Sequence, residues 1–167
     1  MRYPEFLKEH GTIGFVAPSF GCAIEPYHTC FDSALQKFHD RGFATEPGPN
    51  CYEGSGIGIS NTPQKCAEEL MEYYEKKSND ILISCGGGEL MCTVLPYMDF
   101  ERVRKADPKW YMGYSDNTNF IFLLTTLCDV AALYGPCAAS FGMEPYHESL
   151  EDALAILQGK KQEVHSY

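Results

Sequence analysis

Two small polar residues, Ser115 and Asp116, stand where an apolar strand should pass into an apolar helix. The segment 109–127 opens with β-favouring residues, continues through Gly-Tyr-Ser-Asp, and then takes a helical pattern. On such a turn a serine hydroxyl is exposed, and the amide of the next residue can stabilise an oxyanion, as in a nucleophile elbow. The elbow pattern GxSxG is met only in part, because Asn117 replaces the second glycine. The same residues also fit a helix N-cap, which contributes about 1 kcal/mol.

A second polar turn, Cys85–Glu89, contains three successive glycines. Glycines let backbone amides approach a ligand and point at negative charge, so the turn fits half of an oxyanion hole or a phosphate cradle. Neither GxGxxG nor the Lys-Ser/Thr of a P-loop is present. A tight turn without chemistry is the third interpretation. Cys85 has no histidine near it in the sequence, so we expect a buried, inert thiol.

No side chain in the sequence is an obvious general base or metal ligand. The histidines fall in predicted loops, termini or exposed helix positions: His10, His28, His39, His147 and His165. The eight cysteines form no CxxC pair, and no histidine stands at a zinc-ligand spacing. We therefore expect no metal and no disulfide, but reduced and mostly buried thiols.

Strands and helices are predicted to alternate along the chain. Apolar, β-favouring runs predict strands in 11–19, 42–47, 79–88, 109–115 and 130–136. Helical spacing and capping signals predict helices in 29–41, 63–77, 89–98, 116–128 and 147–160, with a long loop at 48–63 and connecting structure at 99–108. This order predicts an α/β fold with a mainly parallel sheet and helices on both faces, either flavodoxin-like or like the N-terminal domain of class I glutamine amidotransferases. Ligands of such sheets bind at the carboxyl ends of the strands, here the turns after Ala17, Ser84 and Met112.

Composition excludes several classes of protein. The chain has 167 residues, enough for one domain with a real core, and 44% of them are hydrophobic. The formal net charge of −10 disfavours a nucleic-acid partner, because phosphate binding needs clustered Lys and Arg. No apolar run is long enough to span a membrane, and the first residues lack the pattern of a signal peptide. We expect a cytoplasmic protein.

The motifs, in their order along the chain, resemble the LD-carboxypeptidase family of serine peptidases. This family includes muramoyltetrapeptide carboxypeptidases and microcin C immunity peptidases. The matching stretches are GTIGFVAPS (11–19), ILISCGGGELMCTVLPYMDF (81–100), WYMGYSDNTNF (110–120) and ALYGPCAASFG (132–142). The muropeptide enzymes usually carry Arg-Gly-Gly-Tyr-Gly at the glycine turn, where this chain has Gly-Gly-Gly-Glu-Leu at 86–90. The sequence therefore looks closer to the immunity-peptidase branch, and the substrate stays open.

The resemblance implies a serine peptidase without metal or cofactor. Ser115 would be the nucleophile, and the backbone amides of Asp116 and Gly88 would form the oxyanion hole, with the register at the glycine open. In this family the histidine and glutamate of the triad come from a C-terminal domain. Residues 1–167 would thus be the N-terminal, nucleophile-bearing domain, inactive alone, and its partners a small peptide-like substrate and the missing domain.

Three alternatives remain. One is an immunity-type peptidase that cleaves a peptidyl- or aminoacyl-nucleotide. Another is a flavodoxin-like binding module without catalysis, which holds a phosphate with Gly86–Gly88. The third is a packing half that exposes the apolar surface meant for its partner domain, and that forms a homodimer or aggregates.

Overall fold

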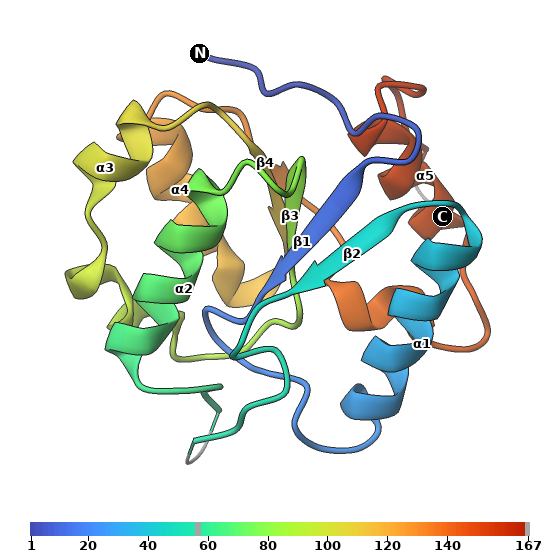
Figure 1. Ribbon diagram of the computed structural model, residues 1–167, viewed down its shortest axis with the longest axis horizontal. Coiled ribbons are helices and arrows are strands. Elements are labelled where there is room, and N and C mark those ends of the chain that lie inside the picture. The colour runs from blue at the N-terminus through green and yellow to red at the C-terminus, as the bar shows by residue number, and fades with distance from the viewer. Residues whose placement is uncertain (56–57, 166–167) are drawn as a thin grey trace.

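A five-stranded, all-parallel sheet forms the centre of the computed structural model, which describes residues 1–55 and 58–165 (Figure 1). The strands are β1 (Thr12–Val16), β2 (Ala44–Pro47), β3 (Ile81–Ser84), β4 (Trp110–Gly113) and β5 (Leu133–Tyr134). Their order is β2-β1-β3-β4-β5, and every pair is parallel. This is the flavodoxin-like doubly wound order, in which the chain changes direction across the sheet between β1 and β3. The predicted fold class is confirmed.

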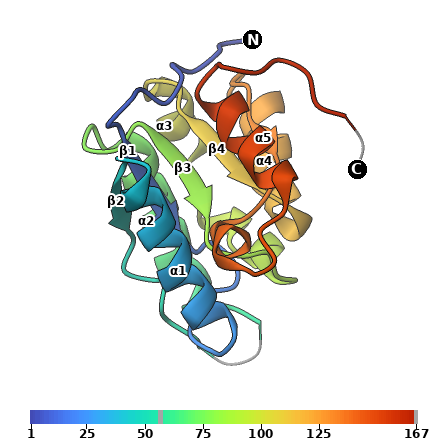
Figure 2. The same ribbon diagram turned by 90° about the vertical axis from the view of Figure 1, so that its right-hand side faces the viewer.

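Helices cover both faces of the sheet (Figures 1 and 2). On one face lie α1 (Tyr27–Asp40) and α5 (Glu148–Leu157); on the other lie α2 (Pro63–Glu75), α3 (Phe100–Lys105) and α4 (Thr118–Thr126). Two separate clusters of buried side chains correspond to these faces. Neighbouring strand residues such as Ile83 and Leu82 belong to opposite clusters, as the period of two in a strand requires.

Local signals explain where the elements begin. All four residues of β3 are buried, which fits a central parallel strand covered on both faces. At the start of α2, the Thr62 side chain accepts a hydrogen bond from the Lys65 amide, and Pro63 occupies the first helical turn. The long loop predicted over 48–63 precedes this helix, although its residues 56–57 lie outside the described part of the chain.

Several short elements differ from the prediction. The segment 99–108, expected to be connecting structure, contains α3, whose first turn is capped by Asp99 accepting from the Arg102 amide at 3.0 Å. Six residues are too few for apolar periodicity to stand out. The helix expected over 89–98 is instead two 3₁₀ turns, Met91–Thr93 and Leu95–Tyr97, since Pro96 cannot donate the amide that an α-helix would need. A further 3₁₀ segment, Ala138–Gly142, was not predicted.

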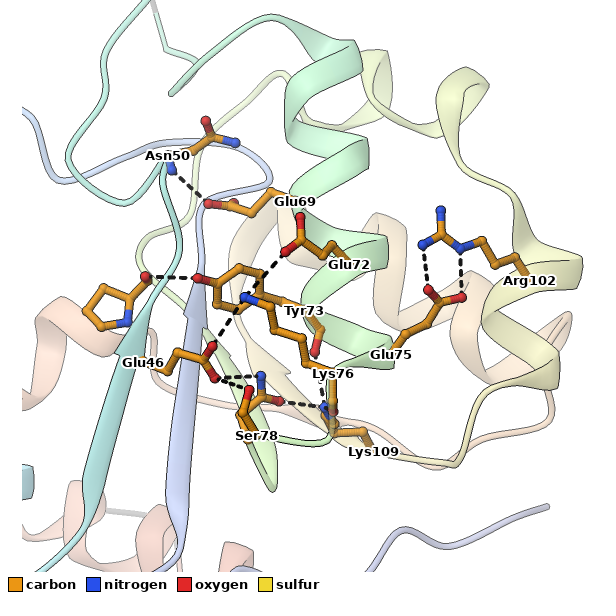
Figure 3. Close-up of polar contacts among 12 residues, drawn as sticks. Glu46, Asn50, Glu69, Glu72, Tyr73, Glu75, Lys76, Ser78, Arg102 and Lys109 are labelled. Carbon is orange, nitrogen blue, oxygen red and sulfur yellow. Dashed lines mark hydrogen bonds and ion pairs between the residues drawn. The ribbon is translucent and has the colours of Figure 1, made fainter.

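A polar network holds α2 against the amino-terminal edge of the sheet (Figure 3). The buried Lys109, just before β4, donates from Nζ to the carbonyl oxygens of Tyr73 (3.0 Å) and Lys76 (2.7 Å), and to the side chain of Asn79. Burial lowers the pKa of Lys109 to about 8. These contacts satisfy carbonyl groups at the end of α2, which have no partner within the helix. Structural polar groups therefore gather at the edge opposite the predicted site.

All eight cysteines are free; six are buried, Cys30 is half-buried and Cys92 is exposed. Among the described residues, no helix is both long and apolar enough to cross a bilayer. No group of three or more His, Cys, Asp or Glu side chains in that part of the chain could hold a metal ion.

Candidate active site at the carboxyl edge of the sheet

Ser115 lies directly beyond the carboxyl end of β4 in a left-handed backbone conformation, with φ of 60°. This region is uncommon for a residue with a Cβ, and it costs energy. Ser115 is exposed and begins a 3₁₀ turn, Ser115–Asn117, that leads into α4. A strained, exposed serine between a strand and a helix has the backbone geometry of a nucleophile elbow. The Ser115 hydroxyl makes no hydrogen bond with any other described residue.

The three turns named in the sequence analysis meet at this edge. A Cβ built on Gly87 would lie 2.9 Å from the Cβ and 3.5 Å from the Oγ of Ser115, so these two residues are in contact across the site. A Cβ on Gly88 would lie 2.2 Å from the Oγ of Ser19, in the turn after β1, and 3.2 Å from Oδ2 of Asp116. Within the glycine corner, residues 86–88, Gly87 thus faces the serine, and Gly88 faces Ser19 and Asp116.

The Asp116 carboxylate joins these turns, a role that sequence reasoning did not foresee. Its Oδ2 accepts from the buried Ser19 hydroxyl and, at 3.2 Å, from the Met91 amide beyond the glycine corner. The other oxygen, Oδ1, is buried and has no hydrogen-bond partner within the described residues. One carboxylate therefore links the loops after β1, β3 and β4. No local signal reveals this, because Ser19 and Asp116 are 97 residues apart in the chain.

Two further residues support the site from outside it. Glu69 of α2 is buried and accepts from the amides of Ala17 and Asn50, both at 2.8 Å; the second contact is drawn in Figure 3. Burial raises the pKa of Glu69, while both amide donors oppose that shift. On the other side, the Ser115 amide donates to the hydroxyl of Tyr134 at 3.1 Å. Glu69 thus fixes the first turn, and Tyr134 fixes the backbone of the serine.

A cleft of about 430 Å³ opens between the glycine corner and Ser115. Aromatic rings line much of it, from Phe20, Tyr27 and Tyr114. Glu89 is the only residue with a charged side chain among the described residues of this lining. The buried Cys85 also borders the cleft, but burial raises the pKa of its thiol well above the usual value. The raised pKa favours the neutral thiol, and Cys85 is buried as expected.

No histidine faces Ser115 in the described part of the chain. The cleft lining contains no histidine. His28 lies 3.6 Å from Asp32 on α1, His39 contacts Thr45, and His147 caps α5. His165 borders a separate pocket beside Tyr134. The arrangement thus presents a hydroxyl and backbone amides, without a histidine to accept the proton of the serine.

The fold is a doubly wound α/β domain, with an exposed serine in a left-handed turn at the carboxyl end of β4. A family model described as the LD-carboxypeptidase N-terminal domain matches residues 13–135. The chain belongs to this family, as the order of its motifs predicted.

The similarity to individual relatives covers more of the chain than the residues that the family model matches. Over 152 residues the chain is 31% identical to a Vibrio cholerae protein named "Putative carboxypeptidase". This alignment covers 87% of this chain and 43% of the relative. It is 28% identical over 159 residues to the microcin self-immunity protein MccF of Escherichia coli, covering 93% and 45% of the two chains. The structure of an MccF-like protein from Bacillus anthracis shares the fold, with a TM-score of 0.85 at 24% identity, over 94% of this chain and 47% of that one. The chain thus spans less than half the length of these relatives.

Proposed function

We propose that this chain is the nucleophile-bearing half of a serine peptidase that hydrolyses the amide bond to the terminal residue of a peptide or peptide-like substrate. The observation that carries the proposal is the exposed Ser115 hydroxyl, held in a left-handed turn in contact with Gly87. In the reaction Ser115 Oγ attacks the carbonyl carbon while its proton passes to a base. The leaving amine then takes that proton, and water releases the acyl group from the serine.

The oxyanion of the tetrahedral intermediate would be held by backbone amides. We assign one donor to Asp116, which follows the nucleophile, and the other to the glycine corner, where Gly87 and Gly88 are the candidates. Gly87 is supported by its contact with Ser115, and none of the hydrogen bonds within the described residues uses its amide. Such a donor typically contributes about 2.7–4 kcal/mol to lowering the barrier.

The base and its orienting carboxylate would come from a second domain. Two observations support this part of the proposal. No histidine lines the described cleft. The relatives that align with this chain are more than twice as long as the chain itself. Apolar side chains also stay exposed beside the site, on Phe122 of α4 and on Tyr134. Such side chains are what a second domain would cover.

An immunity-type substrate, an aminoacyl-nucleotide, is favoured over a muropeptide by the lining of the cleft. Glu89 follows the glycine corner, and no arginine lines the described cleft, so the lining offers no cation to a substrate carboxylate. The rings of Phe20, Tyr27 and Tyr114 suit a flat heterocycle. A structure of MccF, 24% identical to this chain, was solved with glutamyl sulfamoyl guanosine bound.

The proposal is tested with the protein extended through its second domain, compared with residues 1–167 alone. We expect the extended protein to hydrolyse a glutamyl-nucleotide faster than an L,D-tetrapeptide, and Ser115→Ala to abolish both activities. Residues 1–167 alone should show no turnover. Activity that survives Ser115→Ala in the extended protein would refute the nucleophile. Turnover by residues 1–167, lost in Ser115→Ala, would refute the need for a second domain.

A binding module without catalysis is distinguished by two measurements. Fluorophosphonate labelling of Ser115 in the extended protein is expected for the peptidase and not for the module. Calorimetric titration of residues 1–167 with phosphate, nucleotides and flavins would show binding at the glycine corner if the module were the correct interpretation. Sedimentation of the same chain reports whether its exposed apolar side chains lead to a homodimer.

A further inference from the structure

Asn117 occupies the position of the second glycine in the elbow pattern, and its side chain is fully buried. Its Nδ2 group donates to the carbonyl oxygens of Gly86 (3.0 Å) and Tyr114 (2.9 Å). Its Oδ1 atom accepts from the hydroxyl of the buried Tyr111. One carboxamide thus connects the glycine corner, the turn before the serine, and strand β4.

These hydrogen bonds determine which way the Gly86–Gly87 peptide faces. The Gly86 carbonyl accepts from two buried side chains, Asn117 and Ser84, the latter at 2.9 Å, so it points into the protein. In a trans peptide the N–H group points opposite to the carbonyl of the same unit. The Gly87 amide is therefore directed away from the Asn117 carboxamide and the Ser84 hydroxyl.

We propose that Asn117 is a positioning residue, which holds the Gly86–Gly87 peptide in the orientation that presents the Gly87 amide to the reacting carbonyl. The same carboxamide bonds the carbonyl of Tyr114, the residue before the nucleophile. Asn117 therefore sets the spacing between the two halves of the oxyanion hole. The catalytic meaning of this role rests on the proposed function; the structural role does not.

The chemistry of the site explains why asparagine suits this position. The side chain must donate twice and accept once within a buried space, and a carboxamide has two N–H donors and one carbonyl oxygen. An aspartate would place an oxygen against two carbonyl groups, and a leucine would remove one donor from each of them. Gly113, the last residue of β4, leaves room for the carboxamide, because a Cβ at this position would lie 2.7 Å from the Cγ of Asn117.

The structural role is tested on residues 1–167 by ¹⁵N relaxation of the Gly87 amide. In wild type we expect an order parameter of about 0.85, as for rigid backbone, and a fall below about 0.6 in Asn117→Asp and Asn117→Ala. The alanine variant carries the test if the aspartate variant does not fold. Tyr111→Phe is the matched control, because it removes the hydrogen bond to Oδ1 of the carboxamide and keeps the bonds from Nδ2. An unchanged Gly87 order parameter and chemical shift in folded Asn117→Ala would overturn the proposal.

The catalytic meaning is tested in the extended protein. We expect Asn117→Ala to lower kcat by about 10²–10³, the effect of losing one oxyanion donor, with little change in KM. A fall in kcat of less than about threefold, with the Gly87 amide disordered, would show that this amide is not a donor. If wild type itself shows no turnover, the proposed function fails, and the relaxation experiment still decides the structural role.

Discussion

The strain at Ser115 predicts that replacing this serine by glycine stabilises the protein. A left-handed conformation costs a residue with a Cβ about 1–2 kcal/mol, and glycine escapes this cost. Glycine in turn loses more backbone entropy on folding, by about 0.5–1 kcal/mol. Since the exposed Ser115 hydroxyl makes no hydrogen bond with another described residue, little else is lost. We expect Ser115→Gly to raise the free energy of unfolding by about 0.5–1 kcal/mol.

Urea unfolding followed by the fluorescence of Trp110 measures this difference. Trp110 is the single tryptophan, is buried in β4 and stacks on Phe6, so its emission reports the folded sheet. With a urea m-value of about 2 kcal/mol/M, the midpoint should rise by about 0.3–0.5 M. If Ser115→Gly is more stable than wild type, the proposed nucleophile lowers the stability of the native protein in exchange for function.

Two variants separate backbone strain from other causes. Ser115→Ala keeps a Cβ and should leave the stability unchanged to within about 0.5 kcal/mol. Asp129→Gly, at another exposed position with φ of 58°, should also gain stability, by less because it loses the ion pair of Asp129 with the Met1 amino group. If Ser115→Gly is no more stable than Ser115→Ala while Asp129→Gly does gain stability, Ser115 is not strained, and the assignment of an elbow loses its physical basis.

Three further outcomes follow from packing and charge. A Cβ on Gly142 would lie 1.7 Å from a backbone carbonyl oxygen of α1, so Gly142→Ala should lower the free energy of unfolding in urea by about 3 kcal/mol or more. Gly86→Ala is the control, because a Cβ on Gly86 would have no atom closer than 3.5 Å. Equal losses of stability in the two variants would contradict the close packing of Gly142. Because Cys92 is the exposed thiol, a disulfide reagent should rapidly modify about one thiol per native chain, and all eight after unfolding. Rapid reaction of three or more thiols in the native chain would contradict the burial of the other cysteines. The Arg102 guanidinium lowers the pKa of Glu75, so this pair stabilises the fold above the ordinary carboxyl pKa and ceases to do so as the pH falls through the lowered value. Arg102→Met should thus cost up to about 1 kcal/mol at pH 7 and almost nothing near pH 2, and a cost that does not depend on pH would count against the pair.

Much of the fold and the position of the serine could be predicted because their signals are local. An apolar run such as β3 and a capping pair such as Thr62 and Pro63 act within a few residues. The turn from Gly113 to Asp116 likewise lies between a strand and a helix that the sequence already indicates. The order of these elements then restricts the sheet to a parallel, doubly wound one, because crossover connections are right-handed.

Tertiary structure decided the contacts between the turns. Three successive glycines have the same side chain, so only their surroundings distinguish Gly87, beside Ser115, from Gly88, beside Ser19. The hydrogen bond from Ser19 to Asp116 joins residues that are far apart in the chain, and no local pattern encodes it. A sequence specifies which groups are available at the ends of its strands, whereas the sheet alone brings those ends together and orients each group toward the next.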